Sequence, residues 1–431
     1  MPVFLSHDAP DFEERFRDLL AAKREVSEDV DQAVAEIIAS VRDRGIEAVI
    51  ELTRRFDQWE MTEETVTFGD REIDAAIASV DPAERAALEL AAERIRAYHE
   101  RQIPKDEMWE DEVGVTLGWR WTPVDAAGLY VPGGLASYPS SVLMNAIPAS
   151  VAGVRDLAMT APTPDGALNP LVLLAARLSG IETVYRIGGA QAIAALAYGA
   201  GPVRPVDKIT GPGNAWVAAA KRRVFGRVGI DMIAGPSEIL VIADGSQNPD
   251  WIATDLMSQA EHDESAQAIL ITDDETFGRE VERAVDRLLQ RLERSEIAGA
   301  SWRQHGAIVV ANDLDHSAAL SDRVAPEHLE LCVEDPLALS TQIRHAGAIF
   351  LGAHTPEAIG DYVGGPNHVL PTARSARFSS GLSVLDFMKR TTLAQVTPTG
   401  MATIGPAAET LARSESLEAH ALSVRARLDA L

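Results

Sequence analysis

Cysteine is almost absent from the chain. Only one of its 431 residues, Cys332, is a cysteine. A single thiol allows neither an intrachain disulfide nor a thiolate metal cluster, and this composition is typical of proteins that fold in a reducing compartment. We therefore expect a cytoplasmic protein. Because Cys332 lies between Leu331 and Val333, we expect a buried, unreactive thiol and not a nucleophile.

Long apolar segments are absent as well. No run approaches the ~20 residues that a membrane-spanning helix needs. Residues 1–8 lack the basic start and the apolar run of a secretory signal. We therefore expect no membrane insertion. The composition, 46% hydrophobic and 24% charged, is that of a globular protein, and the length predicts two or three domains.

Positive charge is scarce, and arginine supplies most of it. The chain has 65 acidic and 39 basic residues, for a formal net charge of −26. Such a surface repels nucleic acid and anionic membranes, so neither is an expected partner. Two explanations of the acidity stay open: an acidic surface encoded by a GC-rich genome, and adaptation to high salt.

Strand-like and helical segments alternate after the first hundred residues, which are charged and helical in pattern. The strand-like runs form two series, 128–131, 157–159, 183–185 and 208–210, then 239–242, 268–271, 307–310 and 348–351. This alternation predicts an α/β fold with two mostly parallel sheets, each covered on both faces. Beyond Gly381, two helical stretches form a tail with little core of its own, which is expected to pack on another domain or subunit.

Glycine-rich loops follow several of the predicted strands. Glycine lets backbone N–H groups approach a phosphate, and the carboxyl ends of parallel strands are where ligands usually bind. None of the loops completes the G-x-G-x-x-G pattern, because Trp216 stands where a third small residue is needed. A structural turn explains each loop alone, so only their convergence supports a nucleotide site. The loops are Tyr130–Gly134, Gly188–Gln191, Gly211–Asn214 and Gly235–Glu238.

Gln259 and His262 lie three residues apart in a segment whose helix start is marked by Asn248 and Pro249. One helix face would then carry an amide oxygen and an imidazole, which could fill two coordination positions of a divalent cation. A surface helix with an incidental histidine explains this pair alone more simply. Further polar residues lie at loop edges and near the chain end, namely Glu327, His328, Asp361, Glu415 and His420.

Each of these further residues has an ordinary structural explanation, such as a capping carboxylate, a solvated charge or a buried histidine. Together, however, one glutamine, one aspartate and two histidines without cysteine would suit zinc or a neighbouring divalent metal. Glu327 and His328 precede a strand, where an acid or a base would be accessible. Spacing alone does not bring these groups to one place.

Eight motifs in order resemble the histidinol dehydrogenase family over nearly the whole chain, with the weakest signature in the first hundred residues. They are Gly128–Gly134, Ile187–Ala192, Gly211–Asn214, Ala234–Glu238, Ser258–Asp263, Ala325–Leu329, Gly365–Thr372 and Glu415–His420. The resemblance implies a zinc enzyme of histidine biosynthesis. Such an enzyme oxidises L-histidinol through the aldehyde to L-histidine with two NAD.

The resemblance also implies residue roles. One zinc per subunit would be held by Gln259, His262, Asp361 and His420. NAD would contact Tyr130, Gln191 and Asn214. The substrate would contact His328, the four metal ligands, Ser237 and Glu415. The family is a homodimer whose C-terminal tail completes the partner's site, so His420 would act in trans.

Two catalytic roles follow from the same resemblance. His328 would be the general base for both oxidations, and Glu327 would activate water against the aldehyde. Two alternatives stay open. One is a paralogue that oxidises another small hydroxylated substrate, such as a sulfonated diol, and the continuation Asp263–Ser265 favours histidinol over it. The other is a catalytically silent nucleotide- and metal-binding protein, against which the Glu327–His328 pair weighs.

Pattern and resemblance together predict an aldehyde-dehydrogenase-like arrangement of two Rossmann-like domains. We expect residues 25–130 and 237–381 to form the domain that carries the metal and catalytic residues. Residues 131–236 would form the NAD-binding domain. Residues 1–24 would be a helical arm, and residues 382–431 a helical tail that reaches the partner subunit.

Overall fold

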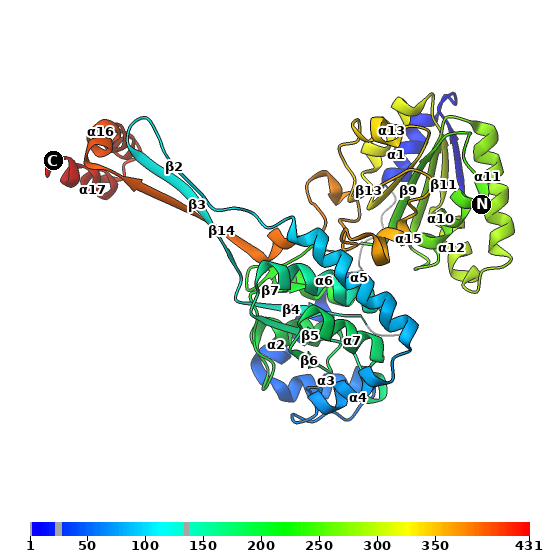
Figure 1. Ribbon diagram of the computed structural model, residues 1–431, viewed down its shortest axis with the longest axis horizontal. Helices are drawn as coiled ribbons and strands as arrows, with labels where there is room; N and C mark the ends of the chain where they lie inside the picture. The colour runs from blue at the N-terminus through cyan, green and yellow to red at the C-terminus, as the bar shows by residue number, and fades with distance from the viewer. Residues whose placement is uncertain (1, 22–27, 133–137, 234) are drawn as a thin grey trace.

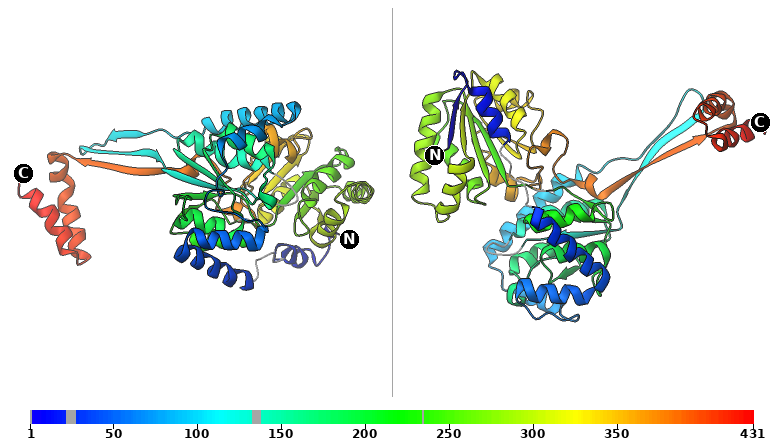
Figure 2. Two further views of the ribbon diagram at one scale, coloured as in Figure 1. Left: turned by 90° about the horizontal axis from the view of Figure 1, so that it is seen from below. Right: turned by 180° about the vertical axis from the view of Figure 1, so that it is seen from behind.

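The computed structural model describes residues 2–21, 28–132, 138–233 and 235–431. Gly133, Gly134 and Ala234 of the predicted glycine-rich motifs lie outside these ranges. The described residues form two α/β domains and a long arm that ends in the C-terminal helices (Figures 1 and 2). Among them, no helix has the length and apolar character needed to cross a membrane.

One domain is built on a six-stranded parallel sheet with the order β1-β11-β10-β9-β12-β13. Its strands are β1 (Val3–Ser6), β9 (Glu238–Ala243), β10 (Gln267–Thr272), β11 (Ala307–Val310), β12 (His328–Cys332) and β13 (Ala348–Leu351). Every residue of β9, β10 and β12 is buried, as expected for parallel strands covered by helices on both faces.

Alternate residues of these strands face two separate layers of helices. Ile239 and Val241 pack against α10 (Pro249–Ala260), α11 (Glu275–Leu289) and α12 (Ser295–His305). Leu240 and Ile242 pack instead against α1 (Phe12–Ala21), α13 (Leu314–Val324) and α14 (Pro336–Ser340). Because successive side chains of a strand point to opposite faces of the sheet, each strand contributes residues to two cores. After β13, α15 (Glu357–Ile359) and a π-helical turn, Gly360–Gly364, lead toward the other domain.

The second domain is built on a five-stranded parallel sheet with the order β6-β5-β4-β7-β8. Its strands are β4 (Ala126–Tyr130), β5 (Asp156–Thr160), β6 (Thr183–Tyr185), β7 (Lys208–Thr210) and β8 (Gly229–Ile230). One face packs on α4 (Asp70–Ala78), α5 (Pro82–Glu100), α6 (Pro139–Ala152) and α7 (Pro170–Ser179). The other packs on α2 (Glu28–Arg44), α3 (Ile46–Asp57), α8 (Gly189–Tyr198) and α9 (Ala215–Val224).

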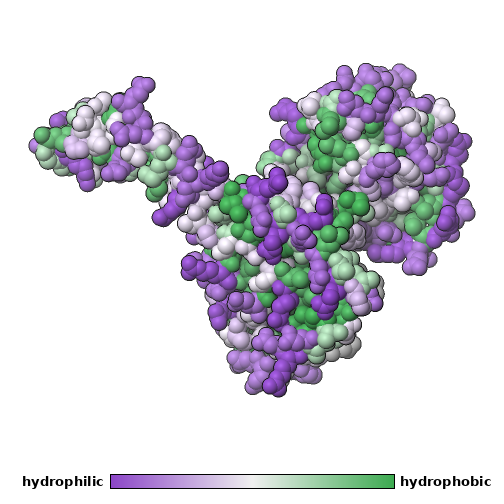
Figure 3. Space-filling view, in the orientation of Figure 1, coloured by the Kyte–Doolittle hydropathy of each residue, from purple (hydrophilic) through white to green (hydrophobic). Residues whose placement is uncertain are grey.

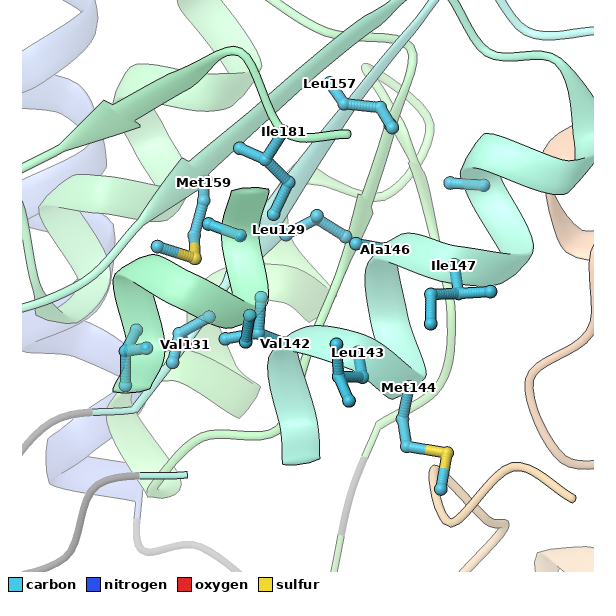
Figure 4. Packing of buried hydrophobic residues seen from close by; sticks show 14 of the residues in the cluster. Leu129, Val131, Val142, Leu143, Met144, Ala146, Ile147, Leu157, Met159 and Ile181 are labelled. Atoms are coloured by element: carbon cyan, nitrogen blue, oxygen red, sulfur yellow. The ribbon is translucent and has the colours of Figure 1, made fainter. Parts of the chain in front are cut away.

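Figure 4 shows part of the first of these cores, where Leu129 and Met159 of the sheet lie beside Val142 and Leu143 of α6. The two parallel sheets confirm the predicted α/β fold class. Both series of strands appear, each with helices on both faces.

The predicted grouping of residues 25–130 with 237–381 differs from the structure. Helices α2 to α5 and strand β4 belong to the five-stranded domain, because apolar faces such as Val34 of α2 and Ile95 of α5 complete its two cores. Residues 2–21 are not a purely helical arm. Val3–Ser6 form β1, which pairs with β11, and Phe16 of α1 is buried in the six-stranded domain.

The arm consists of an antiparallel sheet with the order β14-β3-β2, formed by β2 (Glu107–Glu110), β3 (Val115–Pro123) and β14 (Met388–Val396). It ends in α16 (Pro398–Ser414) and α17 (Glu418–Leu428). The tail was expected to be helical over 382–431. Residues 388–396 instead pair with β3 along its whole length, a partner more than 260 positions away that local pattern does not reveal.

The arm has little core of its own. Several of its large apolar side chains are exposed, and apolar residues are visible at its tip in Figure 3. They are Met108, Trp109, Val396, Ile404, Leu411, Leu417 and Leu422.

Candidate functional site

A cavity of about 350 Å³ lies between the two domains. The five-stranded domain contributes Gly211–Asn214, the loop after β7, as the carboxyl-end rule predicts. The six-stranded domain contributes the opposite edge of its sheet: Ser237 precedes β9, and Glu327 and His328 stand at the start of β12. This edge agrees with the expectation that Glu327 and His328 precede a strand, and it differs from the carboxyl-end position that the glycine-rich loops suggested.

The geometry of α10 explains this opposite edge. The helix begins after Asn248, whose Oδ1 accepts from the backbone N–H of Asp250 at 2.9 Å. It crosses back over β9 and ends at Ala260, so its last turn returns to the amino edge of the sheet. Gln259 lies in that last turn. His262 follows the end of the helix, which was expected to extend to it, and both residues line the cavity.

His328 faces α10 because residues 328, 330 and 332 of β12 point to that side of the sheet, as buried Cys332 does. Its Nδ1 lies 3.0 Å from the carbonyl oxygen of Glu238. With the proton on Nδ1, that nitrogen donates to the carbonyl, and Nε2 is left as the acceptor. Among the described residues Nε2 has no hydrogen-bond partner. Burial lowers the pKa of His328 to about 3, so the imidazole is neutral at pH 7.

Glu327 is held beside His328 by the backbone. Its Oε2 accepts from the N–H of Glu238 at 2.9 Å and lies 3.7 Å from Nδ1 of His328. The residue is 7% exposed and lines the same cavity. A carboxyl group and a neutral imidazole thus stand together in the cavity where a substrate would bind. The buried Cys332, whose pKa is raised by burial, fits the expected inert thiol.

Asp361, in the π-helical turn, places Oδ1 3.7 Å from Nε2 of His328. Burial raises the pKa of Asp361 to about 7, and a neighbouring cation would stabilise its charged form. His368 also lines the cavity, with Nδ1 3.1 Å from the carbonyl oxygen of Asp361. No role was predicted for His368, although it lies in the Gly365–Thr372 motif.

Glu357 was missed altogether. Ligand atoms of His328, Glu357 and Asp361 all lie within 4.8 Å of one another. Gln259 Oε1 is buried and has no hydrogen-bond partner among the described residues. An orphaned amide oxygen beside a carboxylate and the imidazole of His262 fits the donor set of zinc. The cavity thus brings together three of the four predicted metal ligands.

The fourth predicted ligand is elsewhere. His420 lies in α17 and Glu415 caps α16, and both are exposed at the end of the arm. In Figure 1 the C-terminal helices stand at the far end of the arm from the domains. A single chain therefore does not assemble the whole predicted site.

The predicted NAD contacts, Tyr130, Gln191 and Asn214, line a second cavity of about 370 Å³. The Tyr130 hydroxyl accepts from the N–H of Gly189 at 3.2 Å. Gln191 Nε2 is buried without a hydrogen-bond partner among the described residues. Asn214 caps the first turn of α9 and lines both cavities. The two cavities therefore adjoin at the amino end of that helix, where backbone N–H groups favour an anion.

A buried ion pair anchors the loop between the cavities. Lys221 pairs with Asp231, and the two side chains are 3% and 1% exposed. Lys221 Nζ donates to the carbonyl of Gly211 at 3.0 Å, and the N–H of Gly211 donates to Asp231 Oδ2 at 2.9 Å. Gly211 has φ 123°, and a Cβ there would lie 2.0 Å from the carbonyl oxygen of Tyr130. No motif in the sequence pointed to this pair.

Lys221→Met is expected to lower the free energy of unfolding by about 3–5 kcal/mol, because it leaves the Asp231 carboxylate buried without its partner. Thermal and denaturant unfolding measure the loss. Arg177→Met is the control: it removes an exposed ion pair with Asp74 and is expected to cost at most about 1 kcal/mol. Equal losses in the two variants would contradict a structural role for the buried pair.

Comparison with known proteins agrees with this geometry. A family model described as histidinol dehydrogenase matches residues 20–428. Histidinol dehydrogenase from Cereibacter sphaeroides is 71% identical over all of this chain and 99% of its own length, and that from Ruegeria pomeroyi is 70% identical over the whole of both. The crystal structure of histidinol dehydrogenase from Elizabethkingia anophelis, 36% identical, superposes with a TM-score of 0.95 over 100% of this chain and 98% of that one. The chain therefore belongs to the histidinol dehydrogenase family of oxidoreductases.

Proposed function

We propose that the protein oxidises L-histidinol through L-histidinal to L-histidine, with two NAD and one zinc ion per subunit. The observation that carries the proposal is the meeting of Glu327 and His328 with Gln259, His262 and Asp361 in one cavity. The cavity that holds the predicted NAD contacts adjoins it. A cytoplasmic location stays a prediction.

His328 is suited to be the base in both oxidations. Nδ1–H is fixed on the Glu238 carbonyl, so Nε2 can take the proton of the substrate hydroxyl. At the same time, hydride would leave the carbon that bears this hydroxyl and pass to NAD. Glu327 would take a proton from water as that water attacks the aldehyde carbon. After His328 has released the first proton to solvent, the hydrate would lose a hydroxyl proton to Nε2 as hydride leaves its carbon for the second NAD.

Gln259, His262 and Asp361 would hold zinc together with His420. Bound zinc would orient the imidazole and amine of the substrate, which is the templating use of a metal ion. Ser237 lines the same cavity and would contact the substrate. We propose that His420 and Glu415 come from the second subunit of a homodimer. The exposed apolar side chains of the arm support this, because such surfaces are commonly buried in assemblies.

The stoichiometry of NADH tests the reaction. We expect two NADH for each L-histidinol consumed, with L-histidine as the final product, measured by absorbance and product chromatography with zinc-loaded protein. A sulfonated diol supplied in place of histidinol serves as the control and is expected to yield no NADH. One NADH for each histidinol, with the aldehyde as the end product, would contradict the proposal.

A further inference from the structure

Glu357 lies behind the cavity and has no role in the function proposed above. It is the first residue of α15, and its side chain is buried, with the residue 3% exposed. Its backbone N–H donates to Oε1 of Glu330, a fully buried carboxyl on β12, at 2.6 Å. The start of α15 is thereby tied to the strand that carries His328. The backbone of Glu357, from which its buried side chain extends, therefore has a defined position.

The Glu357 side chain meets the amide of Gln259. Nε2 of Gln259 donates to the carbonyl oxygen of Glu238 at 3.2 Å and to Oε1 of Glu357 at 3.0 Å. An amide nitrogen has two hydrogens, and these two acceptors use both. Nδ1 of His328 also lies 3.1 Å from this nitrogen, but it is not an acceptor here because its proton is donated to the Glu238 carbonyl. If the amide turned over, its oxygen would face the two acceptor oxygens of Glu238 and Glu357. The pair of acceptors therefore fixes which end of the amide is which.

The orientation leaves Oε1 of Gln259 as the only free end of the side chain. That atom is buried without a hydrogen-bond partner among the described residues, while Gln259 lines the cavity together with His262 and Asp361. A metal ligand that is free to rotate would have to be ordered when the ion binds. Groups behind a ligand remove this cost and typically change metal affinity by 10–100-fold.

We propose that Glu357 is a positioning residue that holds the Gln259 amide with Oε1 turned toward a divalent cation. The inference rests on the proposed function, in which Gln259 is a zinc ligand. It does not require a charged Glu357, because Oε1 accepts a hydrogen bond from the amide whether the carboxyl is ionised or carries its proton on Oε2. What matters is the position of the oxygen.

Two conservative variants separate position from charge. Glu357→Gln removes the acid but keeps an oxygen at the same distance from the backbone. Glu357→Asp keeps the acid but draws the oxygen back by one methylene group, beyond reach of the Gln259 amide. Zinc affinity of the full-length apoprotein is measured by competition with a chromophoric chelator, without any turnover. Thermal unfolding of each variant verifies that it is folded.

We expect Glu357→Asp to bind zinc about 10–100-fold more weakly and Glu357→Gln to stay within about threefold of the parent protein. Equal or greater weakening in Glu357→Gln would overturn the inference, since charge and not position would then govern affinity. Unchanged affinity in both variants would overturn it as well.

Gln259→Leu is the benchmark that separates this inference from the proposed function. If it binds zinc as tightly as the parent protein, Gln259 is not a ligand and the proposed metal site is wrong. If Gln259→Leu loses zinc while Glu357→Asp retains it, the metal site stands and only the positioning role fails.

Discussion

Glu327→Gln is expected to slow the oxidation of L-histidinal about 10²–10⁴-fold, the usual contribution of a positioned acid–base group. The oxidation of L-histidinol to the aldehyde should slow far less. Glutamine can still accept the hydrogen bond that Glu238 N–H donates to Glu327 at 2.9 Å, so the loop keeps its shape. It cannot take a proton from water, which only the second oxidation requires.

The two steps are measured separately. NADH formation is followed with L-histidinal as substrate, and then with L-histidinol in the presence of a reagent that traps the aldehyde. Glu334→Gln, an exposed position beyond the same strand, is the matched control and is expected to leave both rates unchanged. A similar loss in both steps would show that Glu327 does not act on water.

Mixing two proteins that are each nearly inactive in the oxidation of L-histidinal is expected to restore about a quarter of the parent rate of that step, if the dimer has two shared sites and exchanges subunits at random. The proteins are His420→Ala and Glu327→Gln. In a mixed dimer one site has an intact Glu327 from one chain and an intact His420 from the other. The second site carries both changes. Half of all dimers are mixed, and each has one active site of two.

The structure motivates this test because His420 is exposed at the end of the arm while Glu327 is buried between the domains. Subunit exchange is monitored by native mass spectrometry of chains that carry different affinity tags. Each protein exchanged with itself is the control. If exchange is complete and no activity returns, each site is built from a single chain, and the proposed role of the arm is wrong.

The local sequence pattern determined the fold class, helix starts such as that of α10, and many of the candidate site residues. Apolar runs such as 239–242 and 268–271 alternate with helical segments, and that alternation alone predicts covered parallel sheets. Capping residues are also local, so Asn248 marked the start of α10 correctly. The polar motifs at Gln259, His262, Glu327, His328 and Asp361 were visible because loop and helix-end positions carry reactive groups without a core to fill.

Tertiary structure decided what those segments meet. The sequence of an amphipathic helix such as α5 predicts a buried face but not which sheet covers that face. In the structure α5 packs on the five-stranded sheet. The pairing of β14 with β3 and of β1 with β11 depends on contacts between distant segments, whose register local propensity does not encode.

The site itself shows the same division. The sequence supplied its polar residues, but Gln259 and His262 reach the amino edge of the sheet because α10 runs back across it, an outcome of chain direction within the folded domain. Glu357 and the pair Lys221–Asp231 act through buried partners from other segments. A buried polar group needs such a partner, and the identity of that partner follows from three-dimensional packing, which the order of residues in one segment does not contain.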